Sequence, residues 1–276
     1  MEDRYIEVDG ARLAWSVAGS GTGSATGPAT GSGPLVIVAH GLTMSRARER
    51  EQGLTPWDDL AGSGFRVVAY DARGHGHSSG RAVPEDYRWS SLAGDLLALA
   101  DLLSPDEPVH AIGTSMGTGT ILHALTRRPE RFRSVALAAP PTAWETRAPQ
   151  QRVYAAAAAD AETKTPAELA VIAAAAPLPP IFAEEGAVPP LPDIDHALLP
   201  SVLRGAGTSD LPDPTEVARI RVPALLLAWA TDPGHPVSTT ERLAELLPDA
   251  QAVVAEDVAA IRTWPARAAA FFTAHP

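Results

Sequence analysis

The sequence predicts an α/β fold: a mostly parallel central sheet with helices on both faces and an inserted helical cap. Three observations predict it. Short continuous apolar runs recur along the chain, which is typical of strands buried on both faces. Stretches with apolar residues at helical spacing lie between these runs. One segment, residues 140–220, breaks the alternation and is rich in alanine and proline.

The chain begins with a predicted hairpin. Residues 4–17 alternate apolar and polar side chains around Asp9-Gly10, a dipeptide that favours tight hairpin turns. Residues 19–34 contain only Gly, Ser, Thr, Ala and Pro, so we expect a mobile surface loop there. The strands expected after this loop are residues 35–39, 65–70, 109–112, 134–138, 222–229 and 251–255.

Helices are expected between these strands, and the insertion is expected to form a separate cap. Apolar residues at helical spacing predict helices over 90–103, 116–127, 239–247 and 261–273. We assign residues 1–139 and 221–276 to the core and residues 140–220 to a helical cap, with helices near 148–160 and 166–176. A cap in this position would cover the carboxyl edge of the sheet, where open α/β sheets bind ligands.

Composition and charge exclude several classes of protein. Acidic residues outnumber basic ones 33 to 22, and the net charge of -11 repels nucleic acid and anionic membranes. There is no cysteine, so the chain has no disulfides, thiol nucleophiles or cysteine zinc sites. The first residues lack an apolar signal core, so we expect a cytoplasmic location. We expect no cofactor, because the loop at His40-Gly41 lacks the repeated glycines that cradle phosphate.

Gly113-Thr114-Ser115-Met116-Gly117 lies between a predicted strand and a predicted helix. In that context Gly-x-Ser-x-Gly is typical of a nucleophile elbow, in which a strained turn exposes the serine hydroxyl above the edge of the sheet. The glycines let the neighbouring chain pass close to the turn. Ser115 is therefore the candidate nucleophile.

The loop after the strand at 35–39 supplies a second candidate feature. Its sequence is His40-Gly41-Leu42, and a loop in this place would bring the backbone N–H of Leu42 beside that of Met116. Two converging amides form an oxyanion hole. For His40 we expect a structural role, in which the ring holds the loop by hydrogen bonds.

The segment from Asp71 to Ser78, Asp-Ala-Arg-Gly-His-Gly-His-Ser, indicates a structural turn whose glycines permit a sharp reversal. His75 and His77 have no carboxylate or further histidine at ligand-like spacing, so we expect no metal site. Further along, Asp232 follows the strand predicted at 222–229. A carboxylate after this strand suits the acid of a serine triad in the chain order Ser, Asp, His.

With these motifs the chain resembles the α/β-hydrolase superfamily over nearly its full length. Within it, the chain is similar to the small capped hydrolases that include 3-oxoadipate enol-lactonases and related esterases. The resemblance implies the α/β-hydrolase fold and the roles given above to Ser115, Asp232 and the two amides. Superfamily members that act on epoxides or haloalkanes need a carboxylate at the elbow, where this chain has Ser115.

The resemblance also implies a histidine after the last strand, and residues 256–264 contain none. The eight histidines are at positions 40, 75, 77, 110, 123, 196, 235 and 275. His235, three residues past Asp232 in the same loop, is the best substitute and completes the candidate set. Glu256 or Asp257 is a weaker alternative, because an ordinary carboxylate accepts a serine proton poorly.

The sequence thus predicts a serine hydrolase of small carboxylic esters or lactones with an atypical base. The absent family histidine leaves a second interpretation open: a catalytically degenerate or non-hydrolytic protein that binds a small ligand under the cap. The expected partner is a small-molecule ester or lactone, and a homodimer is left open. The run Arg46–Glu51 alternates in charge, which indicates a solvated face or, alternatively, an arginine that meets an anionic substrate.

Overall fold

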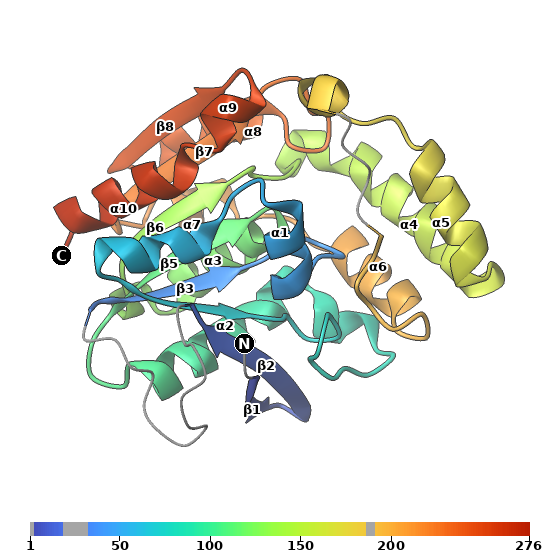
Figure 1. Cartoon of the computed structure of the whole chain (residues 1–276), viewed down its shortest axis with the longest axis horizontal. Coiled ribbons are helices and arrows are strands. Elements are labelled where there is room, and N and C mark those ends of the chain that lie inside the picture. The colour runs from blue at the N-terminus through green and yellow to red at the C-terminus, as the bar shows by residue number, and fades with distance from the viewer. Residues whose placement is uncertain (1–2, 19–32, 186–190) are drawn as a thin grey trace.

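The structure is a computed structural model that describes residues 3–18, 33–185 and 191–276 (Figure 1). Residues 19–32, which make up nearly all of the predicted mobile loop, therefore lie outside the described residues. None of the helices in the described ranges has the length and hydropathy that crossing a membrane requires.

Eight strands of the described ranges form one sheet in the order β1-β2-β4-β3-β5-β6-β7-β8. β1 pairs antiparallel with β2, β2 pairs antiparallel with β4, and the other neighbours are parallel. The prediction of a mostly parallel sheet is confirmed. The strands are β1 (Arg4–Val8), β2 (Ala11–Val17), β3 (Leu35–Ala39), β4 (Arg66–Tyr70), β5 (Val109–Thr114), β6 (Phe132–Ala138), β7 (Ala224–Trp229) and β8 (Ala250–Ala255).

Helices cover both faces of the sheet, as predicted. One core cluster packs α2 (Trp89–Leu103), α3 (Met116–Arg127) and α8 (Val237–Leu246) against the sheet. A second cluster packs α10 (Trp264–Ala274) and the 3₁₀ helix η1 (Trp57–Ser63) on the opposite face. Burial on both faces explains why the sequences of the inner strands are continuous apolar runs. Shorter 3₁₀ helices are η2 (Pro84–Tyr87), η3 (Pro129–Arg131), η4 (Trp144–Thr146) and η5 (Pro180–Glu185).

Two helical segments differ from the prediction. The stretch 261–273 is divided between α9 (Val258–Ile261) and α10, because Pro265 is tolerated in the first turn of a helix but would break a helix that continued through it. The charged run that was interpreted as a solvated face forms α1 (Arg46–Gln52), and Ser45 Oγ caps this helix by accepting from the Arg48 N–H.

The insertion is helical and lies to one side of the sheet. It contains α4 (Arg147–Thr163), α5 (Pro166–Ala175), α6 (Leu199–Gly207) and α7 (Pro214–Val217). In Figure 1 the helices α4, α5 and α6 lie together at the right. Ala158 of α4 and Leu203 of α6 belong to one apolar cluster, so these two helices pack on each other. The chain rejoins the core at α7, which contacts α3 and α8. The limits of the cap at 140 and 220 stay a prediction.

Candidate active site

Ser115 stands at a sharp turn between β5 and α3. Its φ and ψ angles are 52° and −105°, a strained conformation for a residue with a side chain. A Cβ at Gly113 would lie 2.4 Å from the carbonyl carbon of Gly117, and one at Gly117 would lie 2.1 Å from the carbonyl oxygen of Ala39. Both positions therefore require glycine. This is the strained, glycine-flanked turn that the sequence motif predicts.

Ser115, His235 and Asp232 form one hydrogen-bonded line. Ser115 Oγ lies 2.8 Å from His235 Nε2, and His235 Nδ1 lies 2.8 Å from Asp232 Oδ2. Because an ionised carboxylate can only accept, Nδ1 carries the hydrogen and Nε2 is free to accept from the serine hydroxyl. The Asp232 side chain is buried, whereas that of His235 is 25% exposed. The structure thus brings together the three side chains that the sequence proposed.

Two further donors hold the Asp232 carboxylate. Trp229 Nε1 donates to Oδ2 and the Gly234 N–H donates to Oδ1, each at 2.8 Å. Burial by itself would raise the pKa of Asp232, but the hydrogen bonds from His235, Trp229 and Gly234 outweigh it and lower the pKa to about 2. The carboxylate is therefore ionised throughout the neutral pH range.

The imidazole reaches the serine from a strand two places along the sheet. β6 separates β7 from β5, and the loop after β7 carries both Asp232 and His235. The Thr142 N–H, from the chain after β6, donates to the Gly234 carbonyl at 3.1 Å and holds this loop. The Trp229 ring packs edge-on against the His235 ring, with 5.6 Å between the ring centroids. The candidate base is therefore positioned by the same loop as the candidate acid.

The position after β8 holds no imidazole. Glu256 is exposed there, and Asp257 caps α9 by accepting from the Ala260 N–H at 2.7 Å. Among the described residues, His235 is the one imidazole that is hydrogen-bonded to Ser115. The other histidines have different partners: His40 with Gly41 O, His75 with Arg73 O, His77 with Asp3, His110 with Ser134 Oγ, His123 with Asp210 O, His196 with Lys164 O and His275 with Phe271 O.

The two candidate oxyanion amides lie on the segments that meet at the serine. Met116 is the first residue of α3, so its N–H has no acceptor within the helix. The Leu42 N–H has no hydrogen-bond partner in the described part of the chain. A Cβ at Gly41 would lie 3.7 Å from Ser115 Cβ, so this loop is in van der Waals reach of the elbow. Oxyanion binding by these amides stays a prediction.

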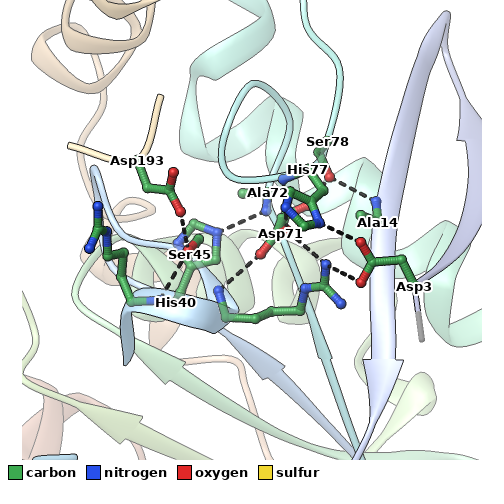
Figure 2. A network of polar contacts seen from close by, with 11 residues as sticks. Asp3, Ala14, His40, Ser45, Asp71, Ala72, His77, Ser78 and Asp193 are labelled. Atoms are coloured by element: carbon green, nitrogen blue, oxygen red, sulfur yellow. Dashed lines mark hydrogen bonds and ion pairs between the residues drawn. The ribbon is translucent and has the colours of Figure 1, made fainter. Parts of the chain in front are cut away.

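A polar network holds the loop that carries Leu42 (Figure 2). His40 Nδ1 donates to the Gly41 carbonyl at 2.7 Å, and His40 Nε2 accepts from the Ala72 N–H at 2.9 Å. This tautomer leaves the ring no free nitrogen, and burial lowers the pKa of His40, so it stays neutral. The expected structural role of His40 is confirmed, and Ala72 belongs to the turn between Asp71 and Ser78 that the sequence also predicted as structural.

The arginines of α1 all form ion pairs within the protein. Each is already paired with a carboxylate, and Arg46 is also buried. None of the three arginines is among the described residues that line the cavity over Ser115, and the alternative interpretation of the charged run as an anion-binding element stays a prediction. The pairs are Arg46 with Asp71 and Asp3, Arg48 with Glu51, and Arg50 with Asp58.

A cavity of about 470 Å³ opens over the site, a volume that suits a small molecule. Ser115 and His235 lie in its wall. The sequence analysis missed Glu49, which also lines it and accepts from the Gly41 N–H at 3.3 Å. A usable signal was present: Ser45 is a good N-cap, and a helix starting there places Glu49 and Gln52 on one face.

Comparison with known proteins identifies the fold. Residues 34–164 match the family model of the alpha/beta hydrolase fold. Epoxide hydrolase B of Mycobacterium tuberculosis is 34% identical over 103 residues, which are 37% of this chain and 28% of that protein. The matched region spans less than half the length of the curated relatives.

Similarity over the whole chain is found with solved structures. A hydrolase from Pseudomonas aeruginosa has a TM-score of 0.75 at 23% identity and covers 99% of this chain and 97% of its own. An enol-lactonase from Burkholderia xenovorans has a TM-score of 0.73 at 24% identity, over 98% and 100% of the two chains. The match over residues 34–164, these structures and the sheet order together show that the chain has the α/β-hydrolase fold.

Proposed function

We propose that the protein is a serine hydrolase that cleaves small carboxylic esters or lactones. The hydrogen-bonded line from Ser115 through His235 to Asp232, opening on the cavity, carries the proposal. A serine hydroxyl is a weak nucleophile and needs a base within hydrogen-bond reach. His235 lies at that distance, so the histidine absent after β8 is replaced from the loop after β7.

In the acylation step, His235 Nε2 takes the Ser115 proton as Oγ attacks the carbonyl carbon. Asp232 keeps the hydrogen on Nδ1 and stabilises the imidazolium that forms. The Leu42 and Met116 N–H groups bind the negative charge that develops on the carbonyl oxygen. His235 then gives the proton to the departing alkoxide or, in a lactone, to the ring oxygen.

Water completes the cycle. His235 takes a proton from a water molecule that attacks the acyl carbon, and it returns this proton to Ser115 Oγ as the acyl group leaves. An ester and one water become a carboxylic acid and an alcohol, and a lactone becomes a hydroxy acid.

The serine at the elbow favours an ester or a lactone as substrate, and not an epoxide, for which the curated relative is named. Opening an epoxide through a covalent ester requires a carboxylate nucleophile in this place, and the chain has Ser115. The enol-lactonase among the structural matches is named for a lactone, which a serine nucleophile can open.

Hydrolysis of p-nitrophenyl acetate by the purified protein tests the proposal. We expect turnover by the wild type and a loss of kcat/KM of at least about 10³-fold in Ser115→Ala and in His235→Ala. His196→Ala is the matched control and keeps the wild-type rate, because the His196 ring contacts the Lys164 carbonyl and not Ser115.

The absence of turnover by the wild type, or equal turnover by Ser115→Ala, would contradict the proposal. Saturable binding of an ester without turnover would instead favour the non-hydrolytic interpretation, in which the cavity only holds a ligand.

A further inference from the structure

The cavity over Ser115 has two unlike walls. The cap contributes apolar surface, including Tyr154, Phe182 and Leu203. The helix α1 contributes the polar side chains of Glu49 and Gln52 to the lining. An amphiphilic ligand would therefore place its alkyl part against the cap and its polar group against α1.

The described residues that line the cavity include no lysine or arginine that could balance the charge of Glu49. Arg46 and Arg50 lie on the same helix, but their guanidinium groups are paired with other carboxylates. A carboxylate in a confined apolar cavity without a counter-charge attracts cations and repels anions.

Glu49 also has unused hydrogen-bonding capacity beside the reacting serine. Oε1 accepts from the Gly41 N–H at 3.3 Å, and Oε2 has no hydrogen-bond partner in the described ranges. A carboxylate has about four acceptor sites. Gly41 is itself in van der Waals reach of Ser115, since a Cβ at Gly41 would lie 3.7 Å from Ser115 Cβ, and Glu49 and Ser115 line the same cavity.

The surroundings of Glu49 bring the pKa of its carboxyl group into the neutral pH range. Burial raises the pKa of Glu49 to about 7, against the hydrogen bond from Gly41 and the charge of Arg50. The negative charges of Asp58 and Asp71 act in the same direction as burial and contribute to this value, and His235 lines the same cavity. A bound cation would favour the ionised carboxylate and release a proton.

We propose that Glu49 is a specificity residue of this site and binds a protonated amino group of the substrate. The inference rests on the proposed function and narrows it to small esters whose acyl or alcohol part carries a primary ammonium group. The alkyl part of such an ester lies against the cap wall. Anionic esters and anionic lactones are disfavoured, because each would bring a second negative charge close to the Glu49 carboxylate.

Competitive inhibition of p-nitrophenyl acetate hydrolysis by three matched probes tests the inference. The probes are n-pentylammonium, 1-pentanol and pentanoate at pH 8. We expect n-pentylammonium to bind about tenfold more tightly than 1-pentanol, and pentanoate to bind most weakly. Equal binding of the ammonium and the alcohol, or tighter binding of pentanoate, would overturn the inference.

Two variants assign the preference to Glu49. Glu49→Gln keeps an acceptor for the Gly41 N–H and removes the charge, so the preference for n-pentylammonium should disappear. Glu51→Gln is the matched control on the same helix, because Glu51 is exposed and pairs with Arg48 outside the cavity; the preference should remain. A preference that persists in Glu49→Gln would overturn the assignment. If Glu49→Gln does not fold, the inhibition of the wild type by the three probes still tests whether the site prefers an ammonium group.

The pH provides an independent readout. In the wild type the inhibition constant of n-pentylammonium should be about tenfold larger at pH 6 than at pH 8, because Glu49 takes up a proton and binding weakens. In Glu49→Gln the constant should change much less. The same dependence in both proteins would show that a group other than Glu49 causes it, and would contradict the inference.

The two proposals can fail separately. If the wild type does not hydrolyse p-nitrophenyl acetate, the proposed function fails, and calorimetry with the same three probes still tests Glu49. If it hydrolyses the ester without an ammonium preference, only the inference about Glu49 fails.

Discussion

Glu49 places a carboxyl group where its surroundings favour the neutral form. Its pKa is about 7 in the folded protein, against 4.5 for an ordinary glutamate, because of burial. Between these two values the folded protein binds more protons than the unfolded chain. The contribution of Glu49 to the free energy of unfolding therefore falls as the pH rises from about 4.5 to 7, and it stays constant above that.

Glu49→Gln should remove this pH-dependent loss of free energy of unfolding. We expect the variant to unfold at a temperature at least about 2 °C above that of the wild type at pH 8, with a smaller difference or none at pH 5. Thermal unfolding followed by circular dichroism at the two pH values measures this. A difference in unfolding temperature that is the same at pH 5 and pH 8 would contradict it.

At the scale of elements, Arg147 joins the first cap helix to its neighbours. Its side chain is buried at the start of α4, and Nη2 donates to the Ala206 carbonyl of α6 at 2.7 Å. Nε donates to the Ser209 carbonyl at 2.8 Å, and the guanidinium lies over the Trp89 ring of α2 at 4.3 Å. These contacts replace the water that burial removes from the charge.

Arg147→Ala should lower the free energy of unfolding by about 3 kcal/mol, because it opens a cavity and leaves buried carbonyls without donors. Urea denaturation measures the loss. Arg152→Ala, an exposed position on the same helix, is the control and should change stability by less than about 0.5 kcal/mol. Equal effects of the two substitutions would show that Arg147 does not hold α4 in place.

At the scale of the whole molecule, Asp193 connects three segments far apart in the chain (Figure 2). Its N–H donates to the Thr43 carbonyl at 2.9 Å, and its carboxylate accepts from Ser45 Oγ at 2.6 Å. Its carbonyl accepts from the Gly76 N–H at 2.8 Å. The segment before α6 is thereby tied both to the loop that carries Leu42 and to the turn after β4.

If this connection positions the Leu42 amide, Asp193→Ala should lower kcat for p-nitrophenyl acetate about tenfold and change KM by less than about twofold. Asp195→Ala, at an exposed position two residues away, is the control and should keep the wild-type kcat. Steady-state kinetics separate the two constants. A rise in KM with an unchanged kcat would show that Asp193 shapes the cavity and does not position the amide.

Local patterns in the sequence predicted the parts of the fold that depend on neighbouring residues. The buried strands, the hairpin at Asp9-Gly10 and the elbow at Ser115 follow from hydropathy, turn chemistry and glycine spacing within a few residues. The helix α1 had a local signal in its N-cap Ser45, but the burial of its first residue, Arg46, depends on the ion pair with Asp71, which is 25 positions away in the chain. Periodicity cannot reveal such a partner.

The candidate site was predictable in its residues but not in its geometry. The sequence offered His235 because it is close to Asp232 along the chain. That its ring reaches Ser115 across the end of β6 depends on the path of the loop after β7, which the Thr142 N–H and the Trp229 ring hold in place. Glu49 shows the opposite case, since its charge was plain in the sequence but its position in the cavity was not.

Labelling by a fluorophosphonate, followed by intact-protein mass spectrometry, tests most directly whether Ser115 is activated by a histidine from the loop after β7. The account predicts a single adduct on the wild type, none on Ser115→Ala, and a labelling rate at least about 100-fold lower for His235→Ala. Labelling of His235→Ala at the wild-type rate, or an adduct on Ser115→Ala, would contradict it.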